Sequence, residues 1–316
     1  MSPAPRNDPG PTPSPRAEGA LYAIGAYLIW GVTPAFWKPL SHLGAWELTA
    51  WRALFSVGVG LLLVVAFGQL RELGRALRTP KTVLPIAGAA LLISINWLVF
   101  LYSVETDRVS HTSLGYYVNP LMSVALGFLL LGERLRPAQS VAVAIATAGV
   151  LWWTWQLGGL PWISAALAGS FALYGLVQRL ASVPPIVGFA GEMLCLAPVA
   201  IAYLWWVPEG PWVFPADTWG TSVWIALSGV VTAAPLVLFA NAARRLPLVM
   251  IGVFQYIAPT LALLLAVLAY AEPFTWKHAG TFVCVWIALA IFTFDSFRTL
   301  RRSPGPPASP ATQESA

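Results

Sequence analysis

The sequence predicts an all-α polytopic membrane protein, with ten transmembrane helices arranged as two inverted five-helix repeats. Three observations predict it: the composition, the spacing of the apolar segments and the placement of the cationic residues. Of the 316 residues, 58% are hydrophobic and 10% are charged. A soluble domain carries about 25% charged residues, so this chain cannot cover a water-facing surface. The composition excludes a cytosolic enzyme, a nucleic-acid-binding protein and a disordered scaffold.

Ten apolar segments follow one another along the chain, each long enough to cross a hydrocarbon core of about 30 Å as a helix. The first segment lacks a small-residue cleavage site, so we expect a helix there rather than a signal peptide. The flanking stretches 1–17 and 300–316 are expected to be disordered cytoplasmic tails, because they are polar and rich in proline. The predicted spans are 19–40, 45–68, 82–104, 111–132, 137–156, 161–179, 186–207, 219–240, 248–270 and 275–297.

The cationic residues sort by side once these spans are assigned. With the N-terminus inside, 14 of the 18 lysines and arginines fall in cytoplasmic segments. Lys38, Arg52, Arg108 and Lys277 remain at or near the outer side. This asymmetry follows the positive-inside rule. Most of the 16 tryptophans fall near the outer helix ends, as expected of an interfacial belt. We therefore expect a multi-pass cytoplasmic-membrane protein with both termini in the cytoplasm.

The two halves of the chain resemble each other at an offset of 139 residues. This offset aligns Tyr117 with Tyr256, Pro120 with Pro259 and Glu133 with Glu272. The predicted repeats are residues 18–156 and 157–299. Five helices per repeat is an odd number, so the second repeat would insert upside down relative to the first. Such inverted repeats are typical of transporters that work by alternating access.

The repeated prolines are candidate gate or hinge residues. A proline frees a backbone carbonyl group and bends its helix. Pro120 lies in the outer half of its predicted span and Pro259 in the inner half, while Pro34 interrupts the first span. We expect the hairpins 82–132 and 219–270 to act as gates, one at each membrane face. The alternative is that these prolines are merely tolerated, as they often are in membrane helices.

Several short motifs carry a family resemblance. They are Trp30-Gly31-Val32-Thr33-Pro34, Ser94-Ile95-Asn96-Trp97, Leu114-Gly115-Tyr116-Tyr117-Val118-Asn119-Pro120, Gly132-Glu133-Arg134-Leu135 and Gln255-Tyr256-Ile257-Ala258-Pro259-Thr260. Over roughly residues 18–297 the chain resembles RarD-type proteins of the EamA branch of the drug/metabolite transporter superfamily. The resemblance implies an inner-membrane carrier with two EamA repeats around a central cavity. One departure is Ala271-Glu272-Pro273, which stands where the first repeat has Gly132-Glu133-Arg134.

Charged residues inside the spans are the first functional candidates, because a charge there is costly unless it is paired or wetted. Glu192 is the deepest acid and is a candidate for proton coupling; a structural ion pair is the alternative. Arg52 is a candidate for binding the solute. With Glu47 and Lys38 it could form an outer vestibule that attracts an anionic or zwitterionic solute, although long cationic side chains also snorkel to water.

Neutral polar and aromatic residues complete the candidate set. The remaining substrate-binding candidates are Trp30, Asn96, Tyr117, Asn119, Gln255 and Tyr256. Interhelical hydrogen bonding and packing explain such residues equally well. Glu133 lies at a predicted helix end, where capping or loop pairing is the favoured interpretation.

Together these features predict a secondary-active transporter that moves a small organic solute, a metabolite or a drug, in the export direction. No catalytic residue, metal site, cofactor or nucleic-acid partner is expected; the partners are the solute and the lipid bilayer, and homo-oligomerisation stays open. A polytopic enzyme acting on a lipid-like substrate is one alternative, although the polar residues do not gather at one interface. A membrane receptor or regulator without transport is the other.

Overall fold

The computed structural model describes residues 14–302 except 41, 107, 207–213, 215–217 and 270–275. These residues form α-helices and one short 3-10 helix, with no strand among them. The helices are α1 (Pro15–Trp37), η1 (Lys38–Leu40), α2 (Ala45–Ala66), α3 (Leu70–Arg78), α4 (Pro80–Glu105), α5 (Val109–Leu131), α6 (Pro137–Gln156), α7 (Trp162–Leu180), α8 (Pro185–Trp206), α9 (Trp219–Arg245), α10 (Leu248–Phe254), α11 (Ile257–Ala269) and α12 (Trp276–Arg302).

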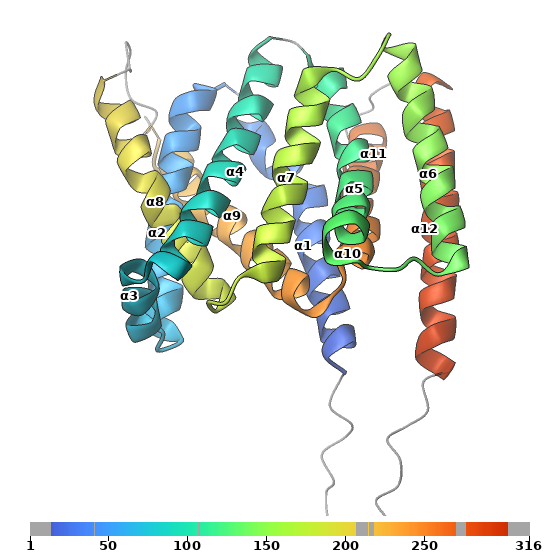
Figure 1. Cartoon of the computed structure of the whole chain (residues 1–316). Helices are drawn as coiled ribbons and strands as arrows, with labels where there is room; N and C mark the ends of the chain where they lie inside the picture. Colours follow the sequence, from blue (N-terminus) through green and yellow to red (C-terminus); the bar gives the residue numbers. More distant parts are fainter. Residues whose placement is uncertain are drawn as a thin grey trace, which may run out of the picture.

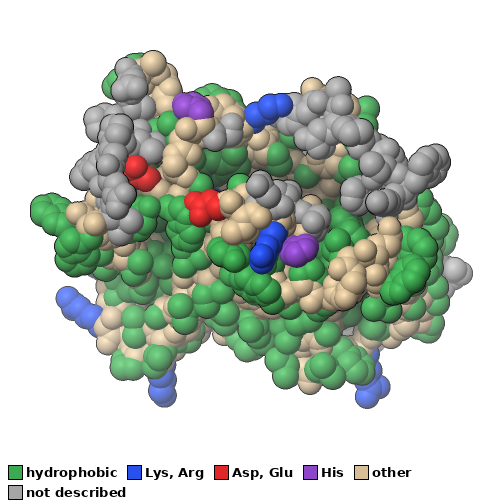
Figure 2. Space-filling model, turned by 90° about the horizontal axis from the view of Figure 1, so that it is seen from above, with side chains coloured by type: hydrophobic (Ala, Val, Ile, Leu, Met, Phe, Trp, Pro, Cys, Tyr) green, Lys and Arg blue, Asp and Glu red, His purple; other side chains and the backbone are tan. Residues whose placement is uncertain are grey.

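The long helices stand side by side as a bundle (Figure 1). The first residues of α1 and the last residues of α12 lie at the same end, the lower end in Figure 1, together with the short helix α3. Seen from above, the opposite end shows a few charged side chains and histidines on a largely hydrophobic surface (Figure 2). Helix α1 therefore begins and α12 ends at the lower end, and few of the described side chains at the upper end are charged.

Within the described part of the chain, eight helical segments are long and apolar enough to cross a membrane: α1 with η1, α2, α4, α5, α7, α8, α9, and α10 with α11. The predicted spans 137–156 and 275–297 also lie on helices, α6 and α12. Three tryptophans and two glutamines make α6 less apolar, and the apolar part of α12 that is described, Gly280–Phe292, is shorter than a span. The all-helical membrane class is confirmed, whereas the count of ten spans stays a prediction.

Helices α6 and α12 nevertheless pack closely against each other. The Thr281 hydroxyl donates a hydrogen bond of 2.9 Å to the carbonyl oxygen of Gly149. A Cβ atom on Gly149 would lie 2.7 Å from the Cβ of Cys284, so only glycine allows this approach. Near the lower end Arg136 forms a 3.0 Å ion pair with Asp295. The two helices thus form one unit despite their weaker hydropathy.

The helix boundaries recur along the chain at the offset found in the sequence. Adding 139 to the bounds of α4 gives 219–244, and α9 is Trp219–Arg245. The same addition to α5 gives 248–270, which α10 and α11 together cover as Leu248–Ala269. Helices α2 and α8 agree to within one residue. Glu272, the expected counterpart of Glu133, lies outside the described residues.

Several sequence-based boundaries were wrong. The stretch 1–17 was expected to be a disordered tail, yet α1 begins at Pro15 because Ser14 caps it through a 3.3 Å bond from the Ala17 amide. At the other end α12 continues to Arg302. The predicted loop after the second span contains α3, an amphipathic helix that buries Leu73 and Ala76 against α8.

The predicted span 248–270 is also not one continuous helix, because it is broken at Gln255 and Tyr256 between α10 and α11. Pro259 explains the place of the break, since a proline cannot donate to the carbonyl four residues earlier and its ring clashes there. The equivalent helix α5 remains continuous through Pro120.

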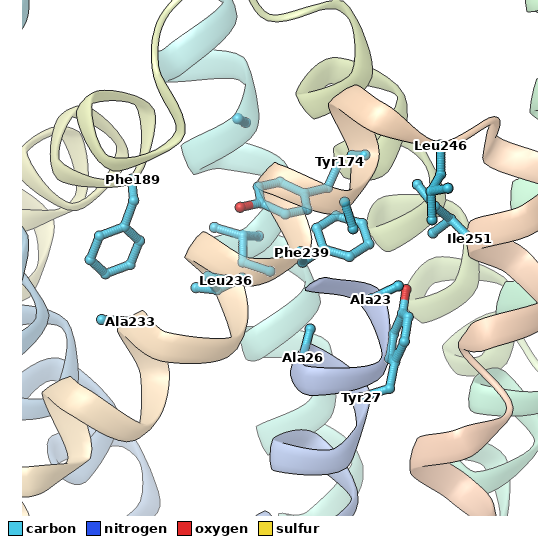
Figure 3. Close-up of a cluster of buried hydrophobic side chains, with 14 of the residues drawn as sticks. Ala23, Ala26, Tyr27, Tyr174, Phe189, Ala233, Leu236, Phe239, Leu246 and Ile251 are labelled. Carbon is cyan, nitrogen blue, oxygen red and sulfur yellow. The ribbon is translucent and has the colours of Figure 1, made fainter. Parts of the chain in front are cut away.

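An aromatic core joins α1, α7 and α9 near the centre of the bundle (Figure 3). Phe239 stacks on Tyr174, with ring centroids 5.8 Å apart, and meets Tyr27 edge to face at 6.3 Å. Trp30 packs against Phe171 and Phe239. This packing fixes the three helices that border the candidate residues described below.

Replacing Gly229 by alanine is expected to destabilise the bundle. A Cβ atom on Gly229 of α9 would lie 2.6 Å from the carbonyl carbon of Phe55 in α2, and a backbone atom cannot swing aside. Overpacking of this kind costs about 1–3 kcal/mol. Gly58→Ala is the matched control, because it changes helix propensity equally but its Cβ would meet no atom within 4 Å. Thermal unfolding in detergent measures both variants; equal midpoints would contradict the prediction.

Candidate functional site

Arg52 lies among aromatic side chains contributed by other helices. Its guanidinium carbon is 3.9 Å from the ring centroid of Trp97 in α4 and 5.4 Å from that of Trp37 at the end of α1. The Nε and Nη2 atoms of Arg52 are buried and make no hydrogen bond in the described part of the chain. The cation is therefore stacked on indole rings while two of its nitrogen atoms have no acceptor.

Asn96 holds two helices together. Its Nδ2 group donates to the carbonyl oxygen of Leu167 at 3.0 Å and to the Ser170 hydroxyl at 3.1 Å, both in α7. This is the interhelical hydrogen bonding that the sequence left open as an alternative to solute binding. Since both bonds use the amino group of the amide, a solute would have to meet the side-chain oxygen of Asn96.

Tyr117, Gln255 and Tyr256 meet where the two halves of the chain touch. The Tyr256 hydroxyl donates a 3.3 Å hydrogen bond to the carbonyl oxygen of Tyr117. The two residues are 139 positions apart, which is the repeat offset. Gln255 pairs with the Ser123 hydroxyl, its Nε2 lying 3.2 Å from the Oγ atom. The break between α10 and α11 exposes neither residue, because Gln255 and Tyr256 remain buried.

Two buried polar atoms of α5 have no hydrogen-bond partner among the described residues. They are the Tyr117 hydroxyl oxygen and the side-chain oxygen of Asn119. The Tyr117 ring packs against Trp153 and Phe282, at centroid distances of 5.4 and 5.2 Å. Leaving such atoms unpaired in a protein interior is costly, so these two atoms of α5 are suited to meet a polar group of a solute.

Glu192 in α8 is 1% exposed and accepts hydrogen bonds from two side chains of α7. Gln178 donates through Nε2 at 2.6 Å, and Tyr174 donates through its hydroxyl at 3.1 Å. A small cleft runs alongside, lined mainly by apolar residues such as Ile86 and Val177, with Thr82 and Ser182 also in its wall. The carboxyl group is thus buried and adjoins a small, largely apolar cleft.

Glu133 joins the two halves at the lower end of the bundle. Its two carboxylate oxygens accept hydrogen bonds from the backbone amides of Leu248 and Val249, each at 2.9 Å. The carboxylate thereby caps the N-terminus of α10, where backbone N–H groups lack helical partners. Capping was the favoured interpretation from the sequence, but the identity of the capped helix was not predicted.

The three prolines have different surroundings. In α1, Pro34 cannot donate the usual helical hydrogen bond to the carbonyl oxygen of Trp30. This oxygen instead accepts a hydrogen bond of 2.5 Å from the Thr33 hydroxyl. In α5 the carbonyl of Pro120 faces α10 so closely that a Cβ atom on Gly252 would lie 2.7 Å from it. Pro259 lies in the first turn of α11, directly after the helix break.

The candidates therefore form three groups rather than one. Arg52 lies with Trp97 and Trp37, Tyr117 with Gln255 and Tyr256, and Glu192 with Tyr174 and Gln178. Trp30 connects to the third group through Phe239. The sequence did not identify Ser123 or Tyr174; for Tyr174, the spacing of four residues to Gln178 on one helical face was the available signal.

A bundle of long apolar helices with buried polar groups in its interior is typical of a multi-pass membrane protein. Comparison with known proteins identifies the class as a transporter. Residues 17–155 and again 159–294 match the EamA-like transporter family. The chain belongs to this family, and within it is of the RarD type.

Named relatives match over nearly their whole length. An uncharacterized transporter of Pseudomonas aeruginosa is 41% identical, over 91% of this chain and 97% of its own. The uncharacterized transporter YojE of Bacillus subtilis is 40% identical, over 90% and 97%. Protein RarD of Streptomyces exfoliatus is 42% identical, over 90% and 91%. A solved crystal structure of a protein 22% identical in sequence has the same fold, with a TM-score of 0.70 over 90% of this chain and 99% of that one.

Proposed function

We propose that this transporter is a secondary-active carrier that moves a small organic solute across the cytoplasmic membrane by alternating access, in the export direction. The observation that carries the proposal is the hydrogen bond between Tyr256 and Tyr117, residues that the repeat makes equivalent. Residues that are equivalent in two related units can touch each other only near the axis that relates the units.

The direction of the helices supports an inverted relation between the two halves. Helix α2 leads down to α3 at the lower end, whereas its counterpart α8 rises from the turn after α7 (Figure 1). Inverted repeats allow a carrier to exchange the conformations of its two halves, which turns an outward-open state into an inward-open one. The proposed units are residues 18–156 and 157–299.

The candidate gates follow from this arrangement. We propose that the hairpin of α4 and α5 and the hairpin of α9 with α10–α11 open alternately, one at each end of the bundle, with Pro34, Pro120 and Pro259 as flexible points. Solute contacts are proposed for Trp30, Arg52, Asn96, Tyr117, Asn119, Gln255 and Tyr256, and proton coupling for Glu192. The unpaired atoms of Arg52, Tyr117 and Asn119 support this assignment.

Purified protein in proteoliposomes is expected to transport at least one solute of a mixed metabolite and drug panel. The panel includes solutes of charge −1, 0 and +1, tested with and without an imposed pH gradient, with protein-free liposomes as the control. Protease protection of the two tails determines the orientation of the protein in the vesicles. Comparing uptake between the two orientations then gives the direction of transport. If no solute moves under either condition, the carrier proposal is overturned.

A further inference from the structure

We infer that the transported solute carries a single carboxylate or a comparable monoanionic group on an aromatic or apolar skeleton, and that Arg52 binds this anion. The inference rests on the proposed carrier function and adds the class of solute. Arg52 lies within the bundle and has no carboxylate within ion-pair distance among the described residues.

Arg52 differs from Arg136 and Arg245, which form ion pairs, and among the described arginines shares its buried, unpaired Nε and Nη2 atoms with Arg244 in the last turn of α9. Arg136 pairs with Asp295 at 3.0 Å, and Arg245 pairs with Glu18 at 3.5 Å. Arg52 has no carboxylate within ion-pair distance among the described residues, and its Nε and Nη2 atoms are buried without an acceptor. Placing a charge in a membrane span is expensive, so an uncompensated one marks a place where a partner binds.

The acid nearest to Arg52 in the sequence is already engaged. Glu47 accepts a hydrogen bond of 3.4 Å from the indole nitrogen of Trp51, one helical turn further along α2.

The position of Trp97 leaves two guanidinium nitrogens without an acceptor. The Trp97 ring centroid lies 3.9 Å from the guanidinium carbon, and a guanidinium carries its N–H donors in its own plane. Because Nε and Nη2 are buried in this state, a carboxylate reaches them only when the surrounding helices separate, and it can then accept two parallel hydrogen bonds from them. The indole holds the planar group in place for this contact.

The surroundings restrict the anion to one charge and favour an apolar skeleton. One guanidinium compensates one negative charge, and a second negative charge would remain without a partner in the same apolar setting. Trp37 and Trp97 supply aromatic surface beside the cation. A solute with an aromatic ring can bury its apolar part there while its carboxylate meets Arg52.

Three probes of similar size and different charge test the inference: phenylacetate, phenylacetamide and phenethylamine. Equilibrium binding to the purified protein is measured for each, followed by uptake into proteoliposomes. We expect the wild-type protein to bind phenylacetate at least tenfold more tightly than the other two. Arg52→Gln is expected to weaken phenylacetate binding at least tenfold, to the level of the amide, and Arg52→Lys to give an intermediate loss.

Arg108→Gln is the matched control. Arg108 is also a cation near the upper end that faces an aromatic ring, 6.0 Å from Tyr102, but it is exposed. This variant is expected to bind all three probes like the wild type. Thermal unfolding confirms that each variant is folded, and Arg52→Lys, which keeps the charge and the long side chain, serves where Arg52→Gln does not fold.

Two results would overturn the inference: equal binding of the three probes to the wild type, or a preference for phenylacetate that both Arg52 variants retain. A failure of the proposed carrier function gives a different result. Tight binding of phenylacetate that depends on Arg52, without uptake of any solute, supports the anion site and contradicts transport. Conversely, uptake of neutral or cationic solutes unaffected by Arg52→Gln supports a carrier and contradicts the anion site.

Discussion

Glu192→Gln is expected to abolish solute accumulation driven by a pH gradient while leaving solute exchange within about threefold of the wild type. Among the described residues Glu192 is the one buried acid. Glutamine fills the same volume and its side-chain oxygen can still accept from Gln178 or Tyr174. It cannot bind or release a proton, so a coupling step at this position would be lost while the binding of solute persists.

The measurement is the ratio of internal to external solute in proteoliposomes with an imposed pH gradient, set beside counterflow without one. Tyr174→Phe is the matched control, since it removes one donor to Glu192 but keeps the carboxyl group. This variant should still accumulate solute. Wild-type accumulation by Glu192→Gln would remove Glu192 from the coupling mechanism, whereas loss of both accumulation and exchange would assign the residue to structure or solute binding.

The sequence predicts helices well and their interruptions poorly. An apolar run of about 20 residues has few alternatives to a helix in a bilayer, because no water satisfies its backbone groups. All ten predicted spans accordingly lie on helices. A proline does not fix the outcome in the same way: Pro120 sits within continuous α5, while Pro259 follows a break. Whether a helix is interrupted at its proline depends on how it packs against other helices, and hydropathy does not predict that packing.

The candidate residues show the same limit. Arg52 and Glu192 were found because a charge in an apolar run is conspicuous at the level of sequence. Their partners could not be found in this way, since Trp97 and Tyr174 lie on other helices and are ordinary aromatic residues of a membrane span. The pairing of Glu133 with the start of α10 likewise joins residues 115 and 116 positions apart. The repeat offset is the exception, because it predicts that Tyr117 and Tyr256 are equivalent, and the two residues are in contact.

Glu133→Ala is expected to loosen the lower end of the bundle. The substitution removes the acceptor of two backbone N–H groups at the start of α10. Hydrogen bonds to a charged group contribute about 1.5–3 kcal/mol when buried, and Glu133 is only half-buried. We therefore expect a total loss of about 2–3 kcal/mol, which corresponds to roughly 30- to 150-fold faster local opening. Glu133→Gln, which keeps one acceptor oxygen, should lose about half of this energy.

Hydrogen exchange measures the effect directly, because the amide protons of Leu248 and Val249 are the ones that the carboxylate holds. Peptides covering 246–254 should exchange faster in Glu133→Ala, while peptides from α6 stay unchanged. Glu18→Gln is the control at the same end: it breaks the exposed pair with Arg245, and such pairs contribute about 0–1 kcal/mol. If this end opens during the transport cycle, the loss of the Glu133 contact should also change the rate of solute exchange. Unchanged protection of Leu248 and Val249 would mean that the contact does not hold the lower end closed.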